Sequence, residues 1–251
     1  MNREEAEQYL YCAMSIGEQL LISGAEVGRV EDTICRICKA YGAERVDVFS
    51  ITSSIVTTMY GEEFGACTQT RRVSGMANDL HKLDCLNQLS RKICALCPEP
   101  SEIKTDLAEI INGPRYSFGM QLLIYGLVSG SFSVFFGGDW KDMAVSAVIG
   151  VLLKFLEAFV KKGAVNGLIT ALICSTAGGF LANLAVQAGL GNHVDLISIG
   201  NIMLFIPGLA LTNALRDMFS GDTITGLIRF MESILLAVII ALGFAVSNFL
   251  F

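Results

Sequence analysis

The 251-residue sequence has little charge for its length. Only 17% of its residues are Asp, Glu, Lys or Arg, whereas 53% are hydrophobic, and the mean hydropathy is +0.55. A soluble domain usually carries about 25% charged residues. This deficit excludes a protein that is water-soluble along its whole length.

Basic residues are the scarcer of the two signs, with 18 Lys and Arg against 24 Asp and Glu. A nucleic-acid-binding domain presents a basic face, so we expect no nucleic-acid partner. The acidic N-terminus lacks the basic segment and continuous apolar core of a cleaved secretory signal, so the first part of the chain is expected to stay in the cytoplasm. A Walker A phosphate loop is also missing, which argues against ATP hydrolysis by this chain.

The charge is concentrated in the first part of the chain. Residues 1–115 contain 12 of the 18 Lys and Arg and 17 of the 24 Asp and Glu, and residues 116–251 contain the remaining 6 and 7. We therefore predict a soluble N-terminal domain with a linker helix over residues 1–112, and a membrane domain over residues 113–251.

The N-terminal domain has the sequence patterns of a small α+β fold. The β-branched and aromatic residues of RVDVFSITSSIVTTMY predict two strands, and ACTQTRRV predicts a third. The spacing of apolar residues predicts four helices, of which the last is capped by Ser101, over residues 3–22, 27–41, 76–96 and 101–112.

The rest of the chain divides into five apolar stretches, each near the ~20 residues that a spanning helix needs. Basic residues flank the ends that we therefore place in the cytosol, and they include Arg115, Lys161 and Arg216. This orientation puts the N-terminal domain in the cytosol and the C-terminus outside. The predicted all-α polytopic domain has spans at Tyr116–Phe136, Met143–Val160, Ala164–Val186, Val194–Leu211 and Phe230–Phe251.

The fourth stretch, NIMLFIPGLALTNALRDMFSGDT, is broken in its middle by a Pro-Gly pair and meets polar residues soon afterwards. One interpretation is an ordinary proline kink followed by the cytosolic end of a span. The other is a discontinuous helix that presents backbone groups to a substrate, as in many transporters. We favour the second and predict a substrate path along Asn201, Pro207, Gly208, Asn213, Arg216 and Asp217.

Few other ionisable residues occur in the apolar stretches. Glu232 begins the last span, where it is either a proton-coupling carboxyl or the partner of Arg229 three residues earlier. Lys154 and Glu157 are spaced as a helical pair with a snorkelling lysine. His193 lies before the fourth span, where we interpret it as a solvated loop residue.

Small residues recur every four positions along one face of the third span. This spacing lets helices approach closely and predicts a packing surface against another span or another subunit. The stripe consists of Gly167, Ala171, Ser175 and Gly179, and it leads to Asn183, which could line a polar path.

Two Cys-x-x-Cys pairs, at Cys35 and Cys38 and at Cys94 and Cys97, have the ligand spacing of a zinc site. The two pairs are far apart in the sequence and both fall in predicted helices, so we interpret them as packing residues and expect no metal and no cofactor. Arg71 and its neighbouring arginine either hold an anion or end a strand in solvent.

Four segments together resemble the threonine/serine exporter family: SGAEVGRVEDTI, TQTRRV, DLHKL and PGLALTNALRDMFSGDTITGLIR. The resemblance covers essentially the whole chain and implies a cytosolic domain followed by a membrane exporter domain. Members of this family occur as long single chains with a second set of spans and as split systems of two subunits. Because this chain has one set of spans, it resembles the larger subunit of a split exporter, whose partner is a smaller membrane subunit. Split relatives include exporters of succinate-type dicarboxylates.

We therefore expect a non-enzymatic subunit of a secondary, proton-coupled exporter in the bacterial inner membrane, working as a homo- or hetero-oligomer. The expected substrates are small polar metabolites, either threonine/serine-type amino acids or short dicarboxylates. The alternative is a membrane-anchored enzyme or a non-transporting sensor or scaffold, with its activity in residues 1–112.

Overall fold

The computed structural model describes residues 1–75, 77–113, 116–163 and 166–249. The chain separates into two compact units. Unit 1 contains Met1–Pro114 and Gly208–Met231, and unit 2 contains Arg115–Pro207 and Glu232–Phe251. Residues 208–231, which we expected in the membrane domain, are thus grouped with the N-terminal domain.

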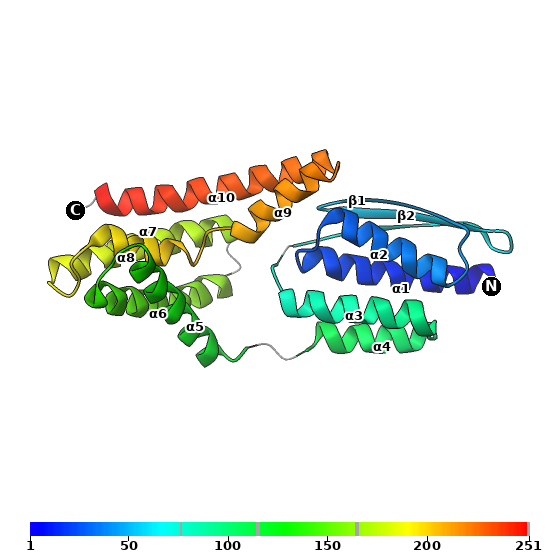
Figure 1. Ribbon diagram of the computed structural model, residues 1–251, viewed down its shortest axis with the longest axis horizontal. Helices are drawn as coiled ribbons and strands as arrows, with labels where there is room; N and C mark the ends of the chain where they lie inside the picture. The colour runs from blue at the N-terminus through cyan, green and yellow to red at the C-terminus, as the bar shows by residue number, and fades with distance from the viewer. Residues whose placement is uncertain (76, 114–115, 164–165, 250–251) are drawn as a thin grey trace. The chain divides into compact units, whose positions relative to one another are not determined.

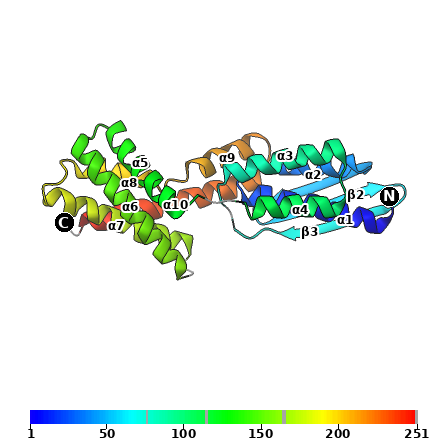
Figure 2. The ribbon, with the colours of Figure 1, turned by 90° about the horizontal axis from the view of Figure 1, so that it is seen from below.

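Unit 1 contains a three-stranded antiparallel sheet with the strand order β1-β2-β3 (Figure 2). Val48 of β1 lies opposite Thr57 of β2, and Thr58 of β2 lies opposite Thr68 of β3. The three predicted strands are confirmed, at Arg45–Ile51, Ser54–Gly61 and Gly65–Arg72.

In the described residues before Gly113, unit 1 contains four helices, α1 to α4, which Figure 1 labels. Two of them begin at other residues than we predicted. The third begins at Leu80, because Asp79 caps it by accepting a hydrogen bond from the Lys82 amide, and Met76 lies outside the described residues. The fourth begins at Pro100, so Ser101 is inside the helix and Glu99 is at the cap. The helices are α1 (Arg3–Ile22), α2 (Val27–Ala40), α3 (Leu80–Leu96) and α4 (Pro100–Ile111).

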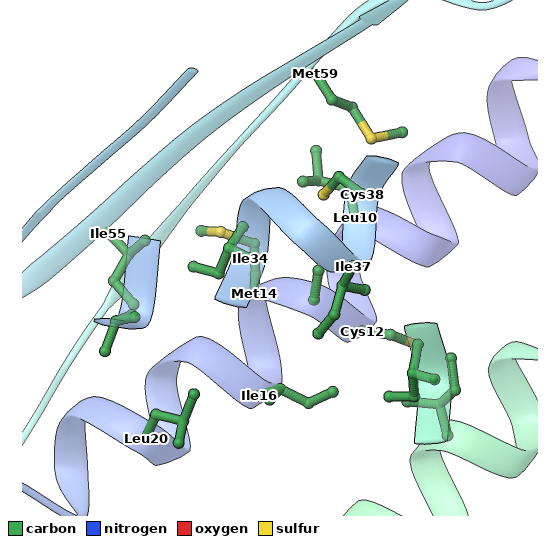
Figure 3. Packing of buried hydrophobic residues seen from close by; sticks show 14 of the residues in the cluster. Leu10, Cys12, Met14, Ile16, Leu20, Ile34, Ile37, Cys38, Ile55 and Met59 are labelled. Carbon is green, nitrogen blue, oxygen red and sulfur yellow. The ribbon is translucent and has the colours of Figure 1, made fainter. Parts of the chain in front are cut away.

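The core of unit 1 lies where α1 and α2 pack on the sheet (Figure 3). Met14 of α1, Ile34 of α2 and Ile55 of β2 are fully buried there. The two helices approach closely at Gly17, where an added Cβ would lie 2.5 Å from Ile34 Cδ1. Burial of such apolar side chains is the main source of stability for the domain.

Two further helices complete unit 1. α9 (Gly208–Phe219) and α10 (Thr223–Phe249) are joined by a short turn in which Gly221 has a φ of +101°. An added Cβ at Gly226 would lie 2.8 Å from the carbonyl oxygen of Ala214, so the two helices pack backbone to backbone. We call residues 208–231, which comprise α9, the turn and the first part of α10, the elbow. The remainder of α10 belongs to unit 2.

Unit 2 also contains four helices that come before the elbow in the sequence. Three of these, together with α10, are long and apolar enough to cross a membrane, so the chain is a multi-pass membrane protein. The four helices are α5 (Phe118–Phe135), α6 (Trp140–Lys162), α7 (Gly167–Gln187) and α8 (Val194–Ile202).

The predicted fourth span is not a continuous helix. α8 ends at Ile202, a turn follows, and a new helix begins only after Pro207. Proline cannot donate the backbone hydrogen bond that would continue the helix. In the described part of the chain there are therefore four long apolar helices, where we predicted five. Two predicted span ends, Ala164 and Phe251, and one flanking cation, Arg115, lie outside the described residues.

The small-residue stripe of α7 lies partly against α10. A Cβ added to Gly179 would overlap Ser247 of α10, and one added to Gly243 of α10 would overlap Ser175 of α7. Ala171 packs in the same interface with Ile240 and Phe244. A Cβ added to Gly167 would have nothing within 4 Å. The packing role of the stripe stays a prediction, which this close approach supports.

Candidate functional site

Three polar side chains meet inside unit 2, from α5, α6 and α8. Ser129 Oγ lies 2.8 Å from both Ser146 Oγ and Asn201 Oδ1, and Asn201 Nδ2 lies 3.3 Å from Ser146 Oγ. All three residues are fully buried. We call Ser129, Ser146 and Asn201 the polar core.

The helices around the polar core lie unusually close together. A Cβ added to Gly200 would lie 2.5 Å from the carbonyl oxygen of Ser129, and one added to Gly150 would lie 2.8 Å from Ser129 Cβ. Within the described residues, the buried hydroxyl of the nearby Ser133 has no hydrogen-bond partner. Polar groups at such depth in a membrane protein are costly and commonly mark a path for a substrate or an ion.

A second polar group lies at the start of α6. The fully buried Asp142 accepts hydrogen bonds from the Asn192 amide at 2.7 Å and the His193 amide at 3.1 Å. Its other oxygen lies 2.8 Å from His193 Nδ1. This hydrogen bond is the main reason why the pKa of His193 is raised. The His193 side chain is thus partly solvated and also bound to Asp142. The interpretation as a solvated loop residue did not include the contact with Asp142.

Asp139, Asp142 and His193 are also a group whose ligand atoms lie within 4.8 Å of one another, which is close enough to surround a cation. Both oxygens of Asp142 are already engaged by amides and by the imidazole. Asp139 in turn caps α6 by accepting from the Lys141 and Asp142 amides. Helix capping therefore accounts for Asp139, and the hydrogen bonds to the Asn192–His193 segment account for the burial of Asp142.

The predicted pair of Lys154 and Glu157 is present on α6. Lys154 Nζ lies 2.9 Å from Glu157 Oε2, and the Tyr125 hydroxyl of α5 donates to the same oxygen at 2.8 Å. Lys161 adds a second ion pair to Glu157. The carboxylate is thus neutralised within unit 2.

The elbow forms hydrogen bonds and an ion pair with the loop between α1 and α2 and with the first residue of α2. Asn213 Nδ2 donates to the Gly24 carbonyl oxygen at 3.0 Å, and Arg216 forms an ion pair with Glu26. Asp217 Oδ1 accepts from the Val27 amide at 3.3 Å. Three residues of the predicted substrate path are therefore engaged with the N-terminal domain.

A buried ion pair completes this contact. Arg229 Nη1 donates to Asp217 Oδ2 at 2.9 Å, and Arg229 Nη2 donates to the Ala25 carbonyl oxygen at 3.1 Å. The side chains of Asp217 and Arg229 are only 2% and 3% exposed. The arginine that we considered for Glu232 thus pairs with Asp217. Glu232 itself is exposed on α10, and its role in proton coupling stays a prediction.

The predicted path residues thus fall into two groups. Asn201 lies in the polar core, and Pro207 ends the interrupted segment after α8. Gly208, Asn213, Arg216 and Asp217 belong to the elbow in unit 1. The use of either group as a substrate path stays a prediction.

Residues 11–250 match the family described as "Putative threonine/serine exporter". The chain belongs to this family, ThrE. The four motifs on which the resemblance was based include both sides of the elbow contact, since SGAEVGRVEDTI contains the loop and PGLALTNALRDMFSGDTITGLIR contains the elbow.

Curated relatives of this ThrE chain differ in length. A "Threonine/serine exporter" of Corynebacterium glutamicum is 27% identical over 89% of this chain but only 47% of the relative. A "Probable succinate transporter subunit YjjP" of Klebsiella aerogenes is 24% identical over 89% of this chain and 86% of the relative. The protein of the same name from Escherichia coli is 23% identical over 97% of this chain and 94% of the relative. The chain thus spans about half the length of the Corynebacterium glutamicum relative and most of the length of the two YjjP relatives. No solved structure matches it.

Sequence reasoning missed part of this ThrE chain's polar core and the acid at the start of α6. Ser129, Ser146 and Asp142 are common polar residues near apolar stretches. One signal was available for α6, because Asp142, Ser146, Gly150 and Glu157 recur at helical spacing within a span.

Proposed function

We propose that this chain is the larger subunit of a two-component secondary exporter of small polar metabolites. The observation that carries the proposal is the buried polar core beside an interrupted membrane segment. The family match and the transporter-subunit names of relatives of similar length support it. A smaller membrane subunit is the expected partner.

We further infer that the interrupted segment crosses the membrane. The three successive apolar helices α5, α6 and α7 would bring the chain to the face opposite the N-terminal domain. α9 nevertheless hydrogen-bonds to that domain through Asn213 and Asp217. The chain must therefore return between α7 and α9, although α8 has only 9 residues where a regular span needs ~20.

Such a crossing supports a substrate path. Backbone that is not helical is tolerated at membrane depth only where protein or water covers it. In transporters, interrupted helices supply backbone groups to the substrate near the midplane. We propose that the path runs along Asn201 and the Pro207-Gly208 break. We also propose that Glu232 couples export to protons, and that the N-terminal domain lies in the cytoplasm of a bacterium with the chain in its inner membrane.

Flux measurements in proteoliposomes test this function. The chain is reconstituted together with a candidate smaller membrane subunit, and uptake of radiolabelled threonine and of succinate is followed under an imposed gradient. We expect one of the two to move, and Asn201→Ala to lower the flux at least tenfold by disrupting the polar core. Thr176→Ala is the matched control, because its hydroxyl donates only to the helix's own carbonyl of Leu172.

Proton coupling is tested in the same vesicles with Glu232→Gln. We expect transport down a substrate gradient to persist and the stimulation by a pH gradient to disappear. If neither substrate moves although both subunits are assembled, the exporter proposal is wrong. If Asn201→Ala transports as well as the wild type, the polar core is not on the path.

A further inference from the structure

Unit 1 contains a pocket with a volume of about 450 Å³ between α1, β3 and α4. Figure 2 shows α4 beside β3 and α1 in this unit. A volume of this size lies within the ~300–1,000 Å³ typical of small-molecule sites. None of the lining residues belongs to the polar core or to the elbow.

Two cations flank an aromatic ring at this pocket. The guanidinium carbon of Arg71 lies 4.6 Å from the ring centroid of Tyr11, and Lys104 Nζ lies 5.6 Å from the same centroid. Within the described residues, no carboxylate lies within ion-pair distance of Lys104. Because Lys104 is exposed, its ammonium group is available to a ligand.

The single lining carboxylate only partly neutralises the pocket. Glu18 Oε2 lies 3.6 Å from Arg71 Nη1, which is too long for a hydrogen bond. Arg71 Nη2 donates to Ser15 Oγ at 3.3 Å. The pocket therefore carries two positive groups against one negative group, in a part of the chain where acidic residues outnumber basic ones.

The other wall of the pocket is apolar. Ile103 and Leu107 of α4 are buried beneath it, and Ala108 and Ile111 extend the same face of the helix. A ligand that fits has an anionic end for Arg71 and Lys104 and a short aliphatic part. Arg and Lys recognise carboxylates through charge-assisted hydrogen bonds.

We propose that this pocket binds a small organic carboxylate, and that it is a ligand site of unit 1 distinct from the transport path. The position of Glu18 separates two kinds of carboxylate. A zwitterionic amino acid places its ammonium group near Glu18 and its carboxylate near Arg71. A dicarboxylate is repelled by Glu18 and depends on both cations.

Titration calorimetry on the full-length chain in nanodiscs tests the proposal. The probes are threonine as a zwitterion, succinate as a dianion and butyrate as a monoanion. We expect saturable binding of at least one. Lys104→Gln should weaken it roughly tenfold, and Arg71→Gln at least as much, since each removes a charge-assisted hydrogen bond. Arg72→Gln is the matched control, because successive side chains of β3 point to opposite faces of the sheet.

Two further variants identify the ligand and the site. Glu18→Gln should tighten succinate binding if the ligand is a dianion and weaken threonine binding if it is a zwitterion. Thr176→Ala should leave binding unchanged, because Thr176 is not among the residues that line this pocket. Lys104→Gln changes an exposed side chain, so its folding can be verified from an unchanged unfolding temperature.

The proposal is overturned if none of the three carboxylates binds at millimolar concentration. It is also overturned if binding survives both Lys104→Gln and Arg71→Gln, since the ligand then occupies another site. Neither result affects the proposed export, which is measured as flux.

Discussion

Asp217 and Arg229 form an ion pair whose two side chains are almost completely buried in unit 1. Asp217 also accepts a hydrogen bond from the amide of Val27, the first residue of α2, and Arg229 also donates to the carbonyl oxygen of Ala25 in the loop before α2. Removing one member of such a pair leaves the other as an unpaired buried charge. The pair therefore tolerates joint replacement better than single replacement.

We predict that Arg229→Met lowers the stability of unit 1 by about 3–5 kcal/mol, because Asp217 would remain buried without its partner. The double variant Asp217→Leu, Arg229→Met should recover part of this loss. Unfolding in detergent, followed by circular dichroism, measures both effects.

The matched control at the same contact is Arg216→Gln. Arg216 and Glu26 have side-chain exposures of 60% and 28%, and exposed ion pairs contribute about 0–1 kcal/mol. If Arg216→Gln and Arg229→Met lowered the stability equally, the prediction would be wrong, because burial of the ion pair would then not determine the loss of stability.

For individual residues, the sequence predicted which side chains of the elbow are unusual but not which residues they contact. Asn213, Arg216 and Asp217 stood out as polar groups after an apolar run. Their partners lie about 190 residues earlier in the chain, and nothing in local spacing connects the two segments. Asn201 was predicted for the path from its place before the break. Ser129 was not, because a lone serine in a span carries no distinguishing signal. Ser146 was missed too, although its helical spacing with Asp142 and Gly150 was a signal.

Helix α7 and the second part of α10 approach each other through residues without bulky side chains. Gly179 faces Ser247, and Gly243 faces Ser175. In a bilayer, where lipid is as apolar as the helices, such close approach is a main source of helix association.

We predict that Gly179→Val weakens the α7–α10 contact by about 1–3 kcal/mol, because the added side chain overlaps Ser247 and forces the helices apart. Gly167→Val lies in the same stripe and should be nearly neutral by comparison, since a Cβ there meets nothing within 4 Å. The unfolding temperature in detergent distinguishes the two. A similar fall in both variants would mean that valine acts through helix propensity alone.

Most elements were predictable because their patterns are local. The three strands followed from β-branched runs, and three of the four long apolar helices lie where hydropathy places them. The predictions failed where a helix terminus or a helix break sets the boundary of an element. Pro207 was recognised as a break, but it separates two helices and leaves no continuous span. α10 begins at Thr223, before the predicted Phe230, because the elbow turn allows the helix to start while it still packs on unit 1.

For the whole molecule, the proposed orientation in the membrane rests on the positive-inside rule and stays a prediction. Seven of the eight cysteines lie in the N-terminal domain, and Cys94 and Cys97 are exposed. Cys174 in α7 is buried. The natural sequence therefore contains thiols that report on the side of the membrane that this domain occupies.

We predict that a membrane-impermeant maleimide labels Cys94 and Cys97 in inverted vesicles and not in intact cells, because the N-terminal domain is expected in the cytoplasm. Replacing both by serine should remove most of the signal. In that background, Leu190→Cys, in the exposed loop after α7, should show the reverse pattern. Labelling of Cys94 in intact cells would reverse the proposed orientation.

The division into a soluble part and a membrane part is a prediction that could be made from charge alone. The membership of residues 208–231 could not, because their hydropathy is that of a membrane segment running into a charged boundary. The long-range contacts of Asn213, Arg216, Asp217 and Arg229 connect them with the N-terminal domain.

The elbow contact also has a consequence for biosynthesis. The Gly24–Val27 loop leaves the ribosome long before Asp217 and Arg229 are translated, so the N-terminal domain first folds without part of its final surface. Its missing segment arrives only after the intervening helices have been threaded into the bilayer. A chain inserted with one crossing too few or too many would deliver the elbow to the wrong compartment. The hydrogen bonds of Asp217 to the Val27 amide and of Arg229 to the Ala25 carbonyl oxygen can form only if the elbow and the N-terminal domain lie on the same side of the membrane.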